Sequence, residues 1–73
     1  MKLWILNRAE EAGYDEARGF VVRASSAVNA RRLASAQAGD EEPATWTDPK
    51  RSTCRELKSD GISGVVMYDF RNG

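Results

Sequence analysis

The segment of residues 19–39, GFVVRASSAVNARRLASAQAG, places the tightest limits on the fold. Its apolar run is rich in β-forming residues and predicts a strand over residues 20–24. Two serines follow, and serine is a strong helix N-cap residue. Glycine commonly ends a helix. Residues 27–38 are therefore expected to form the main helix, begun by one of the two serines and ended by Gly39.

The predicted helix carries a face of small residues. Ala27, Ala30, Leu33 and Ala34 recur at helical spacing, and an alanine-rich face allows a helix to lie close to a sheet. Leu33 is the one large apolar side chain in this set. We therefore expect Leu33 to be a core residue, with Leu33→Ala costing roughly 2–5 kcal/mol.

The first strand is expected over residues 2–7, where Leu3-Trp4-Ile5-Leu6 is apolar at every position. Side chains alternate along a strand, so both faces of this strand are apolar. Such a pattern suits a central strand. A second sheet face formed by Trp4, Leu6 and Val21 would then need a cover, and Trp46, within a predicted loop, is the best candidate.

The C-terminal part of the chain predicts a hairpin. Residues 53–57 are expected to pair with residues 65–69, across a turn that contains Asp60-Gly61. The whole chain is thus read as one α+β domain over residues 1–73 in the order β-β-α-β-β. We expect a small, mostly antiparallel sheet of three or four strands with one helix packed across it.

Charge and composition limit the chemistry. Eleven basic residues balance eleven acidic ones, there is no histidine, and Cys54 is the one cysteine. A zinc site or a cysteine nucleophile normally needs histidine or further cysteines. We therefore expect no enzyme activity, no metal and no cofactor. The short apolar start fits neither a signal peptide nor a membrane span, so an intracellular protein is expected.

Several fragments together resemble a family of short phage and prophage proteins, namely MKLW, GFVVRA, ARRLA, GDE, WTDP, STCREL and GVVMYDF. In size and composition the chain also resembles anti-CRISPR proteins. This resemblance implies a non-catalytic phage-encoded inhibitor in the cytoplasm of the host bacterial cell. It would bind a host CRISPR-Cas effector complex as a monomer or weak homodimer, without a membrane, and block DNA binding.

Acidic loops are the expected contact surface for such a partner, because they could compete with DNA for a basic groove. Two loops concentrate carboxylates, and tyrosine is a favoured interface residue. The candidate partner-binding residues are Glu10, Glu11, Tyr14, Asp15, Glu16, Asp40, Glu41 and Glu42.

Two alternatives remain open. The densest basic stretch, with Trp46 beside it, could grip single-stranded nucleic acid. Its residues are Lys50, Arg51, Arg55 and Lys58. A structural or assembly protein would instead associate with itself through the face of Trp4, Leu6 and Val21.

Overall fold

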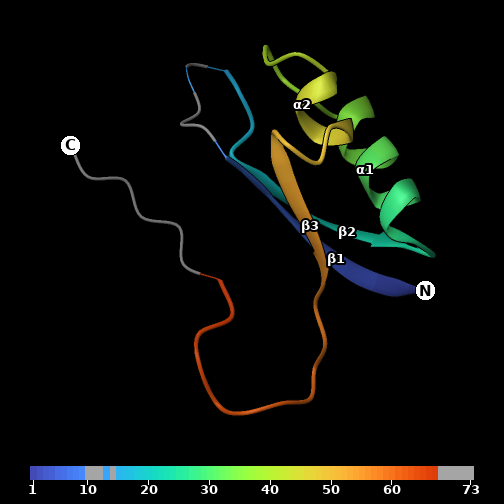
Figure 1. Cartoon of the computed structure of the whole chain (residues 1–73), viewed down its shortest axis with the longest axis vertical. Helices are drawn as coiled ribbons and strands as arrows, with labels where there is room; N and C mark the ends of the chain where they lie inside the picture. The colour runs from blue at the N-terminus through green and yellow to red at the C-terminus, as the bar shows by residue number, and fades with distance from the viewer. Residues whose placement is uncertain (10–12, 14, 68–73) are drawn as a thin grey trace.

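The computed structural model describes residues 1–9, 13 and 15–67. Its elements are β1 (Lys2–Arg8), β2 (Gly19–Ala24), α1 (Ala27–Ala36), α2 (Ala44–Thr47) and β3 (Ser52–Glu56). The strands form one antiparallel sheet in the order β2-β1-β3, and both helices lie on one of its faces (Figure 1). The predicted α+β class and the central position of the first strand are confirmed.

Strand register decides which side chains meet the helices. Leu6 lies opposite Phe20 on β2 and opposite Cys54 on β3, so these three residues share the helix-covered face. Ile5 lies opposite Val21, and both point to the other face. Leu6 and Ile5 are both buried, which agrees with the expectation of a central strand with two apolar faces.

The prediction that Trp4, Leu6 and Val21 share one face of the sheet is wrong. Trp4 and Leu6 alternate with Ile5 and lie under the helices, whereas Val21 points away from them. The alternation within each strand was readable from the sequence. The register between strands was not, and a shift of one residue moves every side chain of a strand to the opposite face.

Trp46 occupies the centre of the core. It is fully buried together with Leu6, Ala30 and Ala34. The ring of Phe20 meets its indole edge to face, with centroids 4.9 Å apart and planes at 85°. The core role predicted for Trp46 is confirmed, but the residue lies on the α1 side of the sheet. It is carried by α2, a short helix inside the segment predicted to be a loop.

Helix α1 begins as predicted. Ser26 is the N-cap, in extended conformation, and its hydroxyl accepts a hydrogen bond from the Asn29 N–H at 3.2 Å. The prediction for Leu33 is wrong, because its side chain is 49% exposed. The stripe that meets the sheet is centred on Ala30 and Ala34, and Leu33 lies about 100° around the helix from Ala34. The close contact made by the alanines leaves Leu33 at the flank.

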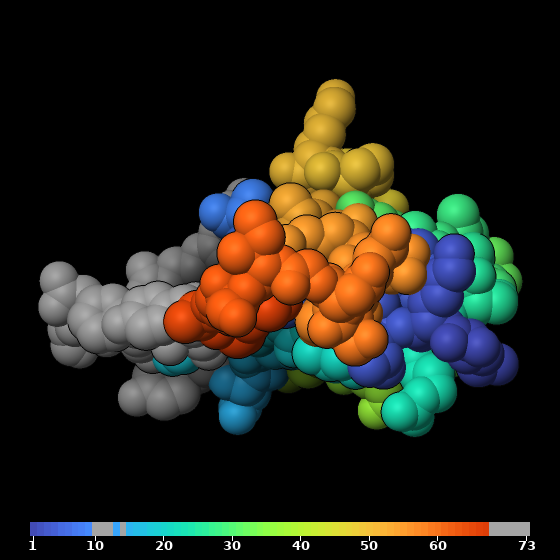
Figure 2. All heavy atoms as spheres, turned by 90° about the horizontal axis from the view of Figure 1, so that it is seen from below, coloured from blue at the N-terminus to red at the C-terminus, as the bar shows by residue number. Residues whose placement is uncertain are grey.

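The predicted C-terminal hairpin is wrong within the described residues. Strand β3 pairs with β1, and residues 57–67 form no strand. The Arg55 guanidinium donates to the Val66 carbonyl at 3.1 Å, and Met67 lines a cavity together with Ile5 and Val21, whose side chains point away from the helices. In Figure 2 this orange to red segment lies in front of the sheet. The end of the predicted strand, residues 68–69, lies outside the described residues.

Candidate functional site

Two acidic loops that are distant in the sequence lie together in space. The Asp40 N–H donates to the Asp15 carbonyl at 2.7 Å, and the Ala17 N–H donates to Glu41 Oε1 at 3.1 Å. Gly39 makes this approach possible, because a Cβ there would lie 2.1 Å from the Asp15 carbonyl oxygen. We call residues 15–17 and 39–42 the acidic double loop.

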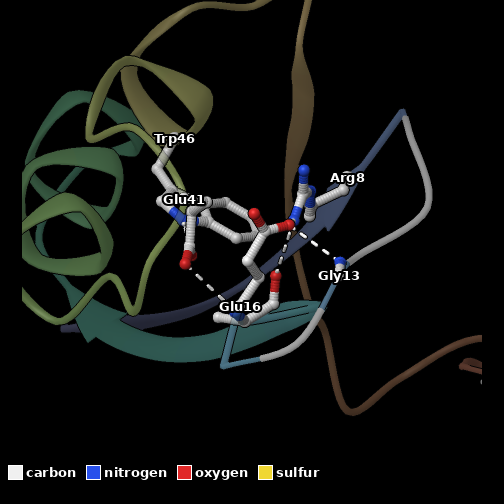
Figure 3. Close-up of polar contacts among 6 residues, drawn as sticks. Arg8, Gly13, Glu16, Glu41 and Trp46 are labelled. Atoms are coloured by element: carbon white, nitrogen blue, oxygen red, sulfur yellow. Dashed lines mark hydrogen bonds and ion pairs between the residues drawn. The ribbon is translucent and has the colours of Figure 1, made fainter.

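Glu41 holds the acidic double loop to the core. Its side chain is buried, and Oε2 accepts a 2.7 Å hydrogen bond from the Trp46 indole N–H (Figure 3). Burial favours a raised pKa for Glu41. The hydrogen bonds from Trp46 and from the backbone of Glu41, Ala17 and Gly39 outweigh burial and lower the pKa. Glu41 is therefore a buried carboxylate that fixes the loops, and its charge is not presented to a partner.

Glu16 also holds its loop in place through hydrogen bonds. Its Oε1 accepts hydrogen bonds from the Gly13 N–H at 2.8 Å and from the Arg8 guanidinium at 2.9 Å (Figure 3). These contacts lower the pKa of Glu16, the backbone hydrogen bond most strongly and the arginine next. Arg8 comes from the end of β1, so Glu16 ties the loop before β2 to the central strand.

Three carboxylates of the acidic double loop face solvent, namely those of Asp15, Asp40 and Glu42. Asp15 has a left-handed backbone with φ of 56°, a conformation that aspartate and asparagine tolerate better than most residues. Glu42 forms an exposed ion pair with Arg51 at 3.1 Å. The other predicted contact residues, Glu10, Glu11 and Tyr14, lie outside the described residues.

The basic residues proposed for nucleic acid are spread along the length of β3. Lys50 and Arg51 precede β3, while Lys58 follows it, so the strand separates them. Arg55 is held by the Val66 carbonyl. Trp46, the expected stacking platform, is 0% exposed. A base cannot stack on this tryptophan without opening the core.

Other functional chemistry is sparse in the part of the chain that the structure describes. Within residues 1–9, 13 and 15–67, no three His, Cys, Asp or Glu side chains come together as a possible metal site. Cys54 is half-buried beside α1, and burial raises the pKa of its thiol. Neither described helix has the length and apolar character needed to cross a membrane.

No protein-family model, curated protein or solved structure matches this sequence.

Proposed function

We propose that the protein is a non-catalytic inhibitor of the anti-CRISPR type, which uses the acidic double loop to occupy a basic DNA-binding surface of a host effector complex. The observation that carries this proposal is the junction of the two loops through Asp15 and Asp40. It gathers carboxylates from two separate segments on one side of a chain whose overall charge is zero.

The ordered backbone that carries the exposed carboxylates supports the proposal. The loops are hydrogen-bonded to each other, and Glu41 attaches them to the buried Trp46. A surface ordered before binding loses less conformational entropy when the partner arrives. Exposed charges also steer association with an oppositely charged partner. We therefore propose that Asp15, Asp40 and Glu42, the last of which is paired with Arg51, act as a preformed acidic surface.

The test uses a panel of purified bacterial CRISPR effector complexes. A gel shift measures how strongly each complex binds its target DNA with and without this protein. We expect one complex to lose DNA binding in the presence of the protein. The triple variant D15N/D40N/E42Q removes the exposed charges and keeps the side-chain shapes. It should be at least about tenfold weaker as an inhibitor.

The matched control is D48N/E56Q/D60N, which removes the same number of carboxylates outside the acidic double loop. This control should inhibit like the original protein. The proposed function is wrong if no complex in the panel is inhibited. The assignment of the surface is wrong if both triple variants inhibit equally well.

The single-strand alternative has less support, since Trp46 is buried and β3 separates the basic residues. It predicts salt-sensitive retention of a labelled single-stranded oligonucleotide, lost in the variant R51A/R55A/K58A. Absence of retention at low salt would remove this alternative.

A further inference from the structure

Within residues 1–9, 13 and 15–67, strand β2 pairs with β1 on one side and with no strand on the other. The Arg8 N–H donates to the Arg18 carbonyl, so these two residues form a hydrogen-bonded pair that continues the register of β1 and β2. Pairs of this kind alternate along an antiparallel ladder. Gly19, Val21 and Arg23 therefore direct their backbone N–H and C=O groups away from β1. Within the described residues, no hydrogen bond covers the outward groups of Val21 or Arg23.

The usual protection of a sheet edge is weak at β2. Edge strands are commonly shielded by proline, by charged side chains, above all lysine, or by a bulge. The sequence GFVVRA has neither proline nor lysine, its one charged residue is Arg23 near the end of the strand, and its pairing with β1 is continuous from Gly19 to Ala24. Val21 is 60% exposed at its middle. In Figure 2 the teal side chains of β2 lie along the lower rim of the molecule.

A second apolar group flanks the same edge. On α1, the side chains of Arg31 and Ser35 reach Ser52 and Pro43, on the side of β3 and α2. Leu33 lies roughly 160° around the helix from Arg31 and so faces the β2 side. It is 49% exposed, and it is the large apolar side chain that the sequence predicted to be buried.

We infer that β2 pairs with β2 of a second copy of this chain, antiparallel about a two-fold axis at Val21. Hydrogen-bonded pairing requires the outward residues to face one another, so Val21 meets Val21 of the second copy. Gly19 then lies opposite Arg23 of the second copy. The result is a six-stranded sheet with the two α1 helices on the same face and the Leu33 side chains near the axis.

The pairing is self-complementary in charge and in size. Each Arg23 faces a glycine instead of a like charge, and like charges directly opposite would destabilise the pair. Phe20 and Val22 face each other across the junction on the helix side, and aromatic side chains opposite β-branched ones stabilise sheets. Both residues are half-buried in the single chain and would extend the core across the interface.

Sedimentation velocity over a concentration series tests the proposal. We expect a monomer–dimer equilibrium, with the dissociation constant raised about tenfold or more by V21K, which places two lysines together on the axis. The matched control is V28K, since Val28 is 66% exposed on α1 but does not lie on the Leu33 flank. V28K should dimerise normally. A chain that stays monomeric to about millimolar concentration, or a dimer unaffected by V21K, would overturn the proposal.

A cross-link tests the register directly. Residues of a hydrogen-bonded antiparallel pair have Cα atoms about 5.5 Å apart, within disulfide range. In a C54S background, V21C should oxidise to a covalent dimer, whereas V28C should remain largely monomeric. Equal cross-linking of the two variants would show that contact at Val21 is not specific, and would contradict the two-fold arrangement.

Discussion

The two flanks of α1 are built differently. On the flank toward β3, the Arg31 guanidinium donates to the Trp46 carbonyl at 3.0 Å, to the Ser52 hydroxyl at 2.9 Å and to the Ser52 carbonyl at 3.0 Å. On the flank toward β2, Leu33 is half exposed. We call these the polar flank and the apolar flank. The polar flank joins three elements and fixes the fold of the single chain, whereas the apolar flank leaves apolar surface available for another molecule.

The largest expected loss of stability comes from replacing Trp46, whose backbone carbonyl belongs to the polar flank. Trp46→Ala removes the central core side chain, its ring contact with Phe20 and the donor that satisfies Glu41. We expect a loss of about 3–5 kcal/mol in the free energy of unfolding. Small domains have about 5–15 kcal/mol in total. Chemical denaturation followed by circular dichroism measures the change, with the exposed Thr47→Ala as control. A loss below about 1 kcal/mol would contradict the core position of Trp46.

Arg31→Ala should come next. It leaves the Trp46 and Ser52 carbonyls without their guanidinium donor, and we expect a cost of about 2–3 kcal/mol. Arg32 is the matched control, because it is exposed on the same helix. Arg32→Ala should change stability by no more than about 0.5 kcal/mol. Equal effects of the two substitutions would mean that the polar flank does not fix α1.

Much of the framework was predictable because local patterns determine it. The apolar run around Ile5 gave the central strand, and the serines before residue 27 gave the start of α1. The position of Leu33 was not predictable. The spacing of apolar residues identifies a helix face, but the sheet selected the neighbouring alanine stripe, which permits a closer approach.

The candidate site was predictable in its parts and not in its assembly. The carboxylates of residues 40–42 are evident in the sequence, but the contact of Gly39 with Asp15 depends on how two loops meet. The buried role of Glu41 also depends on tertiary structure. A glutamate between two other acidic residues gives no sign that it faces an indole. A tryptophan in the same loop, within five residues, was the available signal.

Glu41→Gln tests how the polar core holds the acidic double loop. The pKa of Glu41 is lowered by folding, so the unfolded chain binds more protons between the two pKa values. The stabilisation is therefore complete above the unfolded pKa, near 4.5, and is lost as the pH falls through the folded value. We expect E41Q to cost about 1–2 kcal/mol at pH 7. Its stability should also fall less on acidification.

Denaturation midpoints measured from pH 7 to pH 3 provide this comparison. Glu16 also has a lowered pKa, so E41Q should reduce the acid sensitivity and E41Q/E16Q should reduce it further. An E41Q variant that loses stability on acidification as steeply as the original chain would show that the carboxylate charge of Glu41 does not support the fold.

The smallest effect is expected on the apolar flank. Leu33→Ala should cost less than about 1 kcal/mol in dilute solution, where the proposed dimer would dissociate, because half of the side chain is already exposed. The pattern of the sequence predicted about 2–5 kcal/mol for the same change. At high concentration the cost should grow, since dimer formation stabilises the folded state by mass action. Thermal melts at two concentrations separate these cases, and a large loss that is equal at both would place Leu33 in the core of the single chain.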